Sequence, residues 1–433
     1  MTNLINNIQS QTAKIGIVGM GYVGIPIALL YAKVGYLVTG FDIDKNRVDT
    51  LNSGKSPISN FPDDDIARAI KNGLCVTENM KLISDMDVII ICVPTPLTKQ
   101  RDPDLTFVIN TVEVISQHAS KGTAVSLEST TWPGTTHEVI RPIFEKKGFV
   151  IGQDLYLIYS PEREDPGNRN FSLHDVPKII SGETSACLEL AHVIYRQIVA
   201  NTVALSSTQA AEMTKLLENI QRSVNIGLMN EMKIICSRMN LDIFEIVDAA
   251  KTKPFGFAAY YPGPGVGGQC IPIDPFYLTW KAKEHGLHTR FIELSGEVNA
   301  SMPAYVVEAI IRALNGNGLA IKNSSILLLG LSYKANINDV RYSPSIEIIK
   351  ILYEYGAKME YSDPFWREFP PIRDQTIRLK AVNLTPELIN NYDVVVLLTD
   401  HKDYDYKLLT EHAKLIVDTR GKFDFNASNV VRA

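Results

Sequence analysis

The sequence predicts an α/β protein in which two doubly wound, parallel-sheet domains are joined by a central helical domain with a long connecting helix. Short apolar, β-rich runs alternate with helical patterns near both ends of the 433-residue chain, which is typical of parallel sheets covered by helices. Between them, residues 207–239 contain no proline and one glycine, and helical patterns continue to about Leu314. We therefore expect three domains, over residues 1–205, 206–315 and 316–433.

Composition excludes several classes of function. The formal net charge is −5 and no basic run is present, which argues against nucleic-acid binding. The five cysteines form no CxxC pair, so neither a disulfide framework nor a zinc site is expected. The first thirteen residues are polar and no apolar run is long enough to span a membrane. We expect a cytoplasmic protein without metal or membrane partner.

The first domain opens with a dinucleotide fingerprint. The apolar run Lys14–Gly19 leads into three spaced glycines and a helical pattern, and a second strand, Leu37–Phe41, ends at Asp42. The glycines allow a tight turn and close approach of a pyrophosphate, and Asp42 can accept a hydrogen bond from the adenosine ribose. The pattern predicts a Rossmann domain that binds NAD, although Arg47 could meet the 2′-phosphate of NADP. The expected contacts are Gly19, Gly21, Tyr22, Val23, Gly24, Asp42 and Arg47.

Polar loops follow three further predicted strands of this domain. These strands are Val88–Val93, Ala124–Leu127 and Tyr156–Tyr159, and their loops carry hydroxyl or charged groups. Because ligands bind at the carboxyl ends of parallel strands, we expect such groups to reach a cofactor or substrate, although any single member could be an ordinary polar loop residue. The candidates are Thr95 and Thr130 for the cofactor, Thr131 and Glu162 for the reaction, and Arg163 and Glu164 for the substrate.

The central helix carries a second group of candidates. Lys215, Asn219 and Arg222 stand at i, i+4 and i+7, so they share one helical face. That face could point donors at an anionic ligand, or it could simply be solvated. Apolar residues at helical spacing predict one long helix, and the helical domain is a natural place for a subunit interface. The apolar positions are Met213, Leu216, Leu217, Ile220, Val224, Leu228 and Met232.

A glycine-rich loop, residues 263–275, carries the most distinctive chemistry. Four glycines fall within six residues, Cys270 follows them, and Asp274 lies four residues later. The glycines allow close approach to a ligand, the prolines stiffen the exit, and a thiol beside an acid suits a cysteine that forms a covalent intermediate. The alternative is a Gly/Pro loop in which the cysteine is only a small apolar residue.

The last domain repeats the pattern of the first. The run Ser325–Gly330 is followed by a loop, a helical pattern and a strand that ends at Asp363. The spaced glycines of the first domain are missing here, so a second dinucleotide is not expected. The loop instead carries Lys334 and Arg341, which we expect to meet the phosphates or sugar of a nucleotide.

Five long stretches carry a resemblance to a known family: residues 126–136, 159–168, 210–234, 253–282 and 288–299. On these the chain resembles the nucleotide-sugar dehydrogenases of the UDP-glucose/GDP-mannose dehydrogenase family, from Lys14 to about Lys422. The resemblance implies an NAD-dependent, four-electron oxidation of a UDP-sugar C6 alcohol to a carboxylate, without a metal. It also implies a homodimer, or a higher assembly of dimers, through the central helical domain.

The resemblance also implies residue roles. Cys270 matches the nucleophile, Lys215 and Asn219 the pair on the catalytic helix, and Asp274 the acid that assists water. Glu162 and Thr131 match residues beside the reacting centre. The remaining expected contacts to the nucleotide sugar are Arg163, Glu164, Arg222, Tyr260, Gly267, Lys334 and Arg420, and Arg341 is expected at the cofactor.

Three departures from the family pattern bear on the substrate. Pro166, Ile273 and Tyr342 stand where UDP-glucose enzymes often carry an acid, a lysine and an acid. They point away from UDP-glucose, and UDP-N-acetylglucosamine leads over the N-acetylmannosamine and N-acetylgalactosamine epimers and over UDP-glucose. Two rival functions are a two-electron dehydrogenase of a small hydroxy acid, which has no use for Cys270, and a non-catalytic NAD-sensing protein.

Overall fold

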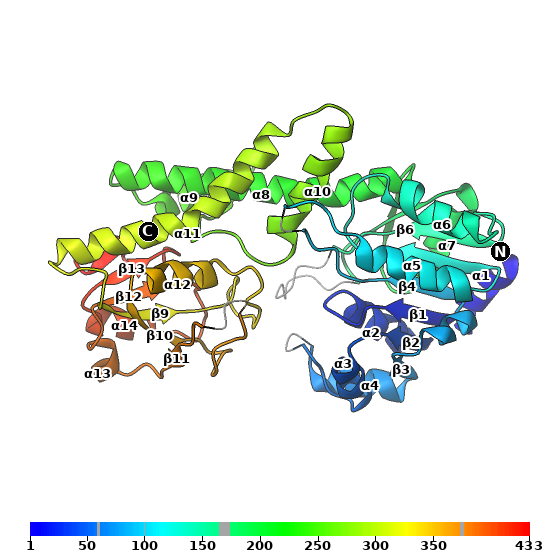
Figure 1. Cartoon of the computed structure of the whole chain (residues 1–433), viewed down its shortest axis with the longest axis horizontal. Coiled ribbons are helices and arrows are strands. Elements are labelled where there is room, and N and C mark those ends of the chain that lie inside the picture. Colours follow the sequence, from blue (N-terminus) through cyan, green and yellow to red (C-terminus); the bar gives the residue numbers. More distant parts are fainter. Residues whose placement is uncertain (59–60, 99, 164–173, 373–375) are drawn as a thin grey trace. The chain divides into compact units, whose positions relative to one another are not determined.

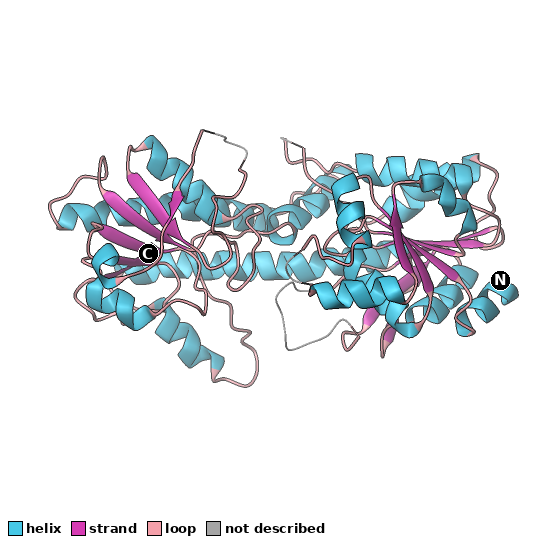
Figure 2. Ribbon diagram, turned by 90° about the horizontal axis from the view of Figure 1, so that it is seen from below, coloured by secondary structure: helices cyan, strands magenta, loops and turns pink. Residues whose placement is uncertain are grey.

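The chain divides into two compact units that each contain one sheet. The computed structural model describes residues 1–58, 61–98, 100–163, 174–372 and 376–433. The first unit comprises Met1–Glu218 with Phe276–His288, and the second comprises Asn219–Pro275 with Thr289–Ala433. In each unit the strands form a central layer with helices on both sides (Figure 2), so the predicted α/β class with two Rossmann-like sheets is confirmed.

The sheet of the first unit has strand order β3-β2-β1-β4-β5-β6-β7-β8 over the described residues. Figure 1 labels β1, β2, β3, β4 and β6 of this sheet. Its strands are β1 (Lys14–Val18), β2 (Leu37–Phe41), β3 (Leu74–Thr77), β4 (Val88–Ile91), β5 (Thr123–Leu127), β6 (Leu155–Tyr159), β7 (Lys178–Gly182) and β8 (Thr202–Ala204). Its helices are α1 (Thr2–Gln9), α2 (Gly24–Val34), α3 (Lys45–Asn52), α4 (Asp63–Lys71), α5 (Thr106–His118), α6 (Arg141–Lys146) and α7 (Ser185–Tyr195). A 3₁₀-helix covers Met80–Asp85, and a π-helix covers Thr135–Ile140.

One feature of this unit differs from the sequence prediction, and a second is an element that was not predicted. Strand β7 runs antiparallel to β6, with Tyr159 opposite Ser181, whereas a wholly parallel sheet was expected. The sequence does not indicate the direction of β7, because β6 and the first four residues of β7 are all buried. A strand buried on both faces shows a continuous apolar run and no alternation. The polar N-terminal segment forms α1, which is held by a 2.6 Å hydrogen bond from the Tyr36 hydroxyl to the Ile8 carbonyl.

The sheet of the second unit has strand order β11-β10-β9-β12-β13-β14 and is parallel over the residues described. Its strands are β9 (Ser325–Leu329), β10 (Lys358–Ser362), β11 (Lys380–Ala381), β12 (Val394–Leu397), β13 (Ile416–Asp418) and β14 (Val430–Arg432). Its helices are α9 (Ile243–Lys251), α11 (Arg290–Gly316), α12 (Pro344–Glu354), α13 (Pro386–Ile389) and α14 (Tyr406–His412).

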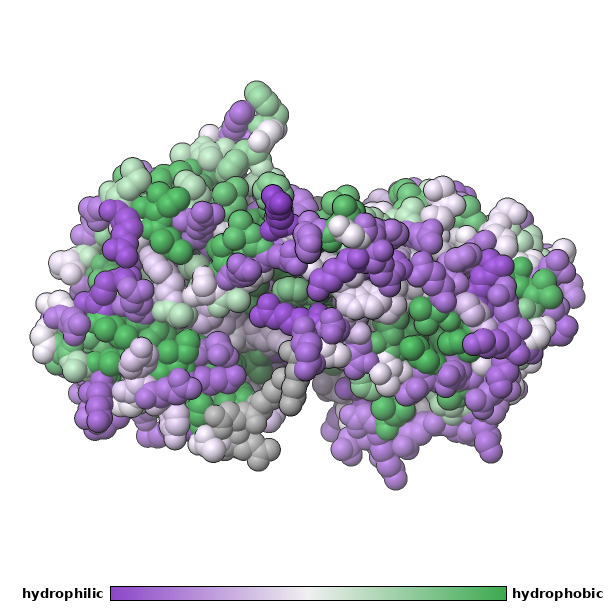
Figure 3. Space-filling view, turned by 45° about the horizontal axis from the view of Figure 1, so that its top comes forward, coloured by the Kyte–Doolittle hydropathy of each residue, from purple (hydrophilic) through white to green (hydrophobic). Residues whose placement is uncertain are grey.

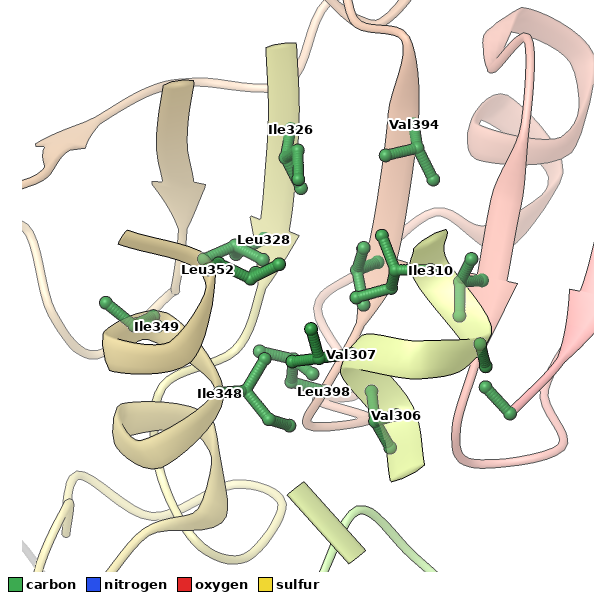
Figure 4. Packing of buried hydrophobic residues seen from close by; sticks show 14 of the residues in the cluster. Val306, Val307, Ile310, Ile326, Leu328, Ile348, Ile349, Leu352, Val394 and Leu398 are labelled. Carbon is green, nitrogen blue, oxygen red and sulfur yellow. The ribbon is translucent and has the colours of Figure 1, made fainter. Parts of the chain in front are cut away.

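Alternate residues of β9 face two different cores. Ile326 and Leu328 pack with apolar residues of α11 and α12 on one face of the sheet (Figure 4). Leu327 and Leu329 pack with residues of α13 and α14 on the other face. This is the two-residue period of a strand buried on both sides.

Two helices have residues in both units: α8 (Thr208–Arg238) and α10 (Cys270–Glu284). The predicted long helix is confirmed by α8. Of the apolar residues whose spacing predicted this helix, Leu216 and Ile220 are buried, whereas Met213, Leu217 and Leu228 are exposed. A polar stripe is also buried, comprising Glu212, Lys215, Asn219, Ser223, Asn230 and Lys233. None of the helices in the described ranges is long and apolar enough to cross a membrane.

The position of Leu328 predicts a large loss of stability on truncation. Leu328 is fully buried in the core of Figure 4, so Leu328→Ala leaves a cavity and is expected to lower the free energy of unfolding by about 2–5 kcal/mol. The measurement is the urea concentration at the midpoint of the unfolding transition of the second unit. Leu319→Ala is the matched control, because Leu319 is 37% exposed. Equal midpoints for the two variants would contradict this packing.

Candidate active site

The turn after β1 has the shape that three spaced glycines permit. Gly19 has a φ of 94° and its N–H donates to the Phe41 carbonyl at 2.8 Å. A Cβ added to Gly24 would lie 1.9 Å from the Gly19 oxygen, whereas a Cβ added to Gly21 would meet nothing within 4 Å. Gly24 is therefore needed for the turn itself, and Gly21 leaves open space beside it.

The adjacent helix end suits an anion. Tyr22 and Val23 lead from the turn into α2, whose N-terminus has no side-chain cap and whose first turn has no acidic residue. The positive end of the helix dipole is thus left for a phosphate. Together with the open space at Gly21, these features fit the pyrophosphate of a dinucleotide.

Asp42, at the end of β2, is anchored by the turn. Its Oδ2 accepts a 2.9 Å hydrogen bond from the Met20 N–H, and its Oδ1 accepts from the Asp44 N–H at 2.9 Å. Arg47 pairs with Oδ2 at 3.0 Å. From the sequence, Arg47 could have contacted the 2′-phosphate of NADP. In the structure its guanidinium is instead paired with the carboxylate of Asp42, the residue that favours NAD.

Several predicted site residues in the strand-end loops of the first unit are buried or half-buried. Thr95 and Thr131 are buried, and Thr130 is half-buried. The Oγ1 of Thr131 has no hydrogen-bond partner among the described residues. A buried hydroxyl without a partner is costly, so this atom suits a contact with a bound molecule.

Glu162 and Arg163 follow β6, and their side chains have different partners. Glu162 is buried and lies 3.3 Å from the Lys178 ammonium. The guanidinium of Arg163 pairs with Glu218 at 2.6 Å and donates to the Pro177 carbonyl at 2.7 Å. Glu164 and Pro166 lie outside the described residues.

The cysteine loop of the second unit leads directly into a helix. Cys270 is the first residue of α10 and is exposed. The sequence predicted that the prolines stiffen the exit from the loop. In the structure Pro272 lies in the first turn of α10, where proline is tolerated, and Pro275 lies inside the helix. Helix N-termini stabilise thiolates, and Asp274 lies one turn further along α10, on the same face. The Asp274 carboxylate accepts a hydrogen bond from the Asn219 amide of α8.

Glycines let this loop lie against the loop that follows β9. The Gly268 N–H donates to the Arg341 carbonyl at 2.9 Å. A Cβ added to Gly267 would meet the Cβ of Tyr333 at 2.5 Å, and one added to Gly268 would meet the Tyr333 ring at 2.9 Å. No larger residue fits at either position without movement of the backbone.

Basic side chains line the same part of the second unit. Arg341 is held by two oxygens of Asp339 and donates to the Gln269 side chain at 3.0 Å, one residue before Cys270. Arg420 donates to the Leu398 carbonyl at 2.7 Å, and its guanidinium would lie 3.0 Å from a Cβ at Gly263. Lys334 belongs to the loop after β9. These cations suit an anionic nucleotide.

Two of the predicted substrate contacts lie apart from this arrangement. Arg222 is exposed, whereas Lys215 and Asn219 on the same helix are buried. Tyr260 is half-buried and its hydroxyl donates to the Gln221 side chain at 2.7 Å. No group of three or more metal-binding side chains occurs in the part of the chain that the structure describes.

Sequence reasoning missed the polar residues that hold the cysteine loop. The Asn230 side chain accepts from the Gly263 N–H at 3.0 Å and donates to Asn299 at 2.9 Å. The Lys233 ammonium donates to the carbonyls of Gly263 and Thr419, at 3.4 and 3.5 Å. Burial lowers the pKa of Lys233 to about 7, and Arg420 contributes. Their spacing from Asn219 along α8 was a signal that could have identified them.

Known proteins resemble this chain over nearly its whole length. Family models match residues 13–199 (UDP-glucose/GDP-mannose dehydrogenase family, NAD binding domain), 209–301 (central domain) and 327–425 (UDP binding domain). A UDP-N-acetyl-D-glucosamine 6-dehydrogenase of Salmonella typhi is 35% identical over 90% of both chains. A UDP-N-acetyl-D-mannosamine dehydrogenase of Pyrococcus horikoshii is 32% identical over 90% of both chains.

Solved structures agree with the family models. A structure of UDP-D-ManNAc dehydrogenase from Pyrococcus horikoshii has a TM-score of 0.86 at 28% identity, and covers 97% of this chain and 98% of that one. The predictions of the fold class and of NAD as cofactor are confirmed by these comparisons. The chain is therefore an NAD-dependent dehydrogenase of the UDP-glucose/GDP-mannose dehydrogenase family.

Proposed function

We propose that this enzyme oxidises the C6 hydroxyl of UDP-N-acetyl-D-glucosamine to a carboxylate in a four-electron reaction, which supplies a precursor for surface polysaccharide. The observation that carries the proposal is the position of Cys270. It begins a helix directly beside the Gln269–Arg341 hydrogen bond, so a thiol and a cationic loop of the UDP-binding domain lie together in one unit. A two-electron dehydrogenase needs no such thiol.

The proposed chemistry proceeds through a covalent intermediate on Cys270. A general base removes the C6 hydroxyl proton. Two NAD molecules, bound in turn, would accept one hydride each. The Cys270 thiolate adds to the resulting aldehyde, and Lys215 and Asn219 stabilise the oxyanion of the thiohemiacetal. Loss of the second hydride gives a thioester. Water then breaks the C–S bond, assisted by Asp274 or Glu162, and the thiolate and the carboxylate are released.

The Asn219–Asp274 hydrogen bond supports two of these roles. Asn219 directs its amide N–H to the Asp274 carboxylate, which fixes the orientation of both side chains. Asp274 lies one turn after Cys270, on the same face of α10. Lys215 lies one turn before Asn219 on α8, so it can add a positive charge for the oxyanion.

The choice of sugar rests on relatives and on one buried residue. Relatives named for the N-acetylglucosamine and for the N-acetylmannosamine substrates both resemble the chain at over 30% identity. Ile273 is buried, and a lysine at this position would carry an unpaired charge into the core. Ile273 thus argues against the glucose nucleotide, and N-acetylglucosamine leads because the relative named for it is 35% identical. The N-acetylmannosamine, N-acetylgalactosamine and glucose nucleotides are the alternatives.

We also infer a homodimer through the central helices. Apolar side chains reach the surface in several groups (Figure 3). In the second unit, α8 and α11 approach closely at Gly227 and Ser295, and the neighbouring Leu228 and Leu294 are at least half exposed. Exposed leucines beside a helix crossing favour an interface. Light scattering should give twice the 48.2 kDa chain mass, and a monomer mass would contradict the inference.

The stoichiometry of NADH tests the proposed reaction. With excess NAD and limiting UDP-N-acetylglucosamine, we expect two NADH per sugar at completion, measured by absorbance. Cys270→Ala is expected to form no acid, because it cannot form the thioester. Cys75→Ala, at another exposed cysteine, should still give two NADH.

Other yields have clear consequences for the proposal. One NADH per sugar in the unmodified enzyme would mean that oxidation stops at the aldehyde, and would exclude the covalent role of Cys270. No NADH, with a yield of two from another UDP-sugar, would replace the proposed substrate and keep the chemistry.

The glycine turn predicts two separable effects on NAD binding. Gly21→Ala is expected to weaken NAD binding by about tenfold or more with unchanged thermal stability, because the added methyl group meets only the space of the pyrophosphate. Gly24→Ala is expected to lower both affinity and stability, because its methyl group meets the Gly19 carbonyl. Calorimetric titration with NAD and thermal unfolding measure the two effects. Unchanged NAD affinity in Gly21→Ala would place the pyrophosphate elsewhere.

A further inference from the structure

Three charged side chains are buried together near the ends of β5, β6 and β7. Glu128 directly follows β5, Glu162 follows β6, and Lys178 is the first residue of β7. Their side chains are 0%, 8% and 6% exposed. Buried charges cost free energy unless they are paired and hydrogen-bonded, so the contacts of this group show what it is built to do.

Lys178 bridges the two carboxylates. Its ammonium donates to Oε2 of Glu128, and also to Oε2 of Glu162 at 3.3 Å. The other oxygen of Glu162, Oε1, accepts a 2.6 Å hydrogen bond from the Arg163 N–H. Both oxygens of Glu162 are thus held by donors, which restricts the rotation of its carboxylate.

Glu128 is held from its other side. Its Oε1 accepts a 2.6 Å hydrogen bond from the Tyr195 hydroxyl, which is itself 2.7 Å from the Ser126 hydroxyl. These contacts fix Glu128, and Glu128 in turn fixes the ammonium of Lys178. The chain of contacts therefore runs from buried hydroxyls through Glu128 and Lys178 to Glu162.

The charges within the group do not balance. One ammonium faces two carboxylates, and burial raises the pKa of Glu128 to about 7, against the attraction of Lys178 and with the repulsion of Glu162. Burial alone lowers the pKa of Lys178, but the two carboxylates outweigh it and raise that pKa. Among the residues that the structure describes, the other titratable groups facing the cluster are Tyr31 of α2, Tyr195 of α7 and Cys92 after β4, and burial raises the pKa of each.

We propose that Glu128 and Lys178 are positioning residues that set the orientation and the charge of the Glu162 carboxylate for its part in the reaction. The proposal rests on the proposed function, in which either Asp274 or Glu162 assists water, and it takes Glu162 as that carboxylate. Glu128 and Lys178 act through Glu162 and need no contact with the substrate.

The two positioning residues have opposite electrostatic effects on Glu162. The Lys178 cation attracts the negative charge of the Glu162 carboxylate, so its removal takes away a cation that favours this charge. The Glu128 anion repels that charge and also competes for Lys178, so loss of the Glu128 charge has the opposite effect. A purely structural pair would not shift one titration in two directions.

The test is the pH profile of the turnover rate at saturating UDP-N-acetylglucosamine and NAD. Glu162→Gln first identifies the acid limb that belongs to Glu162, because that limb disappears in the variant. Lys178→Met is expected to move this limb to higher pH by about 1 unit, and Glu128→Gln to lower pH by a similar amount. Lys178→Arg should restore the limb close to its original position, because the cation is kept.

Glu183→Gln is the matched control. Glu183 directly follows β7 and has a buried side chain paired with His137 and Arg141, but it makes no described contact with Glu162. Its substitution also removes a buried charge, and the limb should not move. If Lys178→Met fails to fold, Glu128→Gln carries the test, because it keeps the size of the side chain and one of its two acceptor oxygens.

The outcomes separate this proposal from the proposed function. If the Glu162 limb is present but neither substitution moves it, or if both move it in the same direction, the positioning proposal is overturned. A limb that survives in Glu162→Gln also overturns it, because Glu162 then has no part to be positioned for. Failure of the proposed function is seen separately, as fewer than two NADH per sugar in the unmodified enzyme.

Discussion

The buried polar stripe of α8 is the constraint on which the candidate site depends. Buried polar groups must find hydrogen-bond partners, and each contact that satisfies the stripe also fixes a loop. Glu212 accepts from the N–H groups of Gly134 and Thr136 in the first unit. In the second unit, Asn219 holds Asp274, Asn230 holds the Gly263 N–H, and Lys233 holds the carbonyls of Gly263 and Thr419. One helix thus orders the loop with Thr131 and the loop that leads to Cys270, within their respective units.

The two sheets share one hydrogen bond at the end of β2 and of β10, and they differ in the loop that follows the first strand of each sheet. The Asp42 carboxylate accepts from the N–H of the residue after Gly19, and the Asp363 carboxylate accepts from the N–H of the residue after Gly330, at 2.9 and 2.7 Å. In the first unit the chain then enters α2 within five residues, which leaves a helix N-terminus for a pyrophosphate. In the second unit α12 begins only at Pro344, and the longer loop carries the arginine and lysine side chains that suit a nucleotide sugar.

The sequence predicted those features that depend on local patterns. Strands β1, β4 and β9, the glycine turn, the two acids at strand ends and the length of α8 follow from short-range periodicity and backbone requirements. The direction of β7 and the buried face of α8 do not, because they depend on which surfaces meet in space. Burial of polar residues of α8 together with Leu216 and Ile220 departs from the usual amphipathic rule. Lys178 and Glu128, which lie 50 residues apart in the sequence, had no local signal that joins them.

The buried apolar residues and the buried charged residues of this fold have different roles. Stability comes from apolar cores such as those on the two faces of β9, because burial of apolar surface is the dominant favourable term. Buried ion pairs are often no more stabilising than apolar residues of the same size, so Glu128, Lys178 and the polar stripe of α8 are poor contributors to stability. What they do supply is fixed orientation, since a buried charge tolerates few positions. Their location beside the candidate reacting groups is therefore better explained by positioning than by folding.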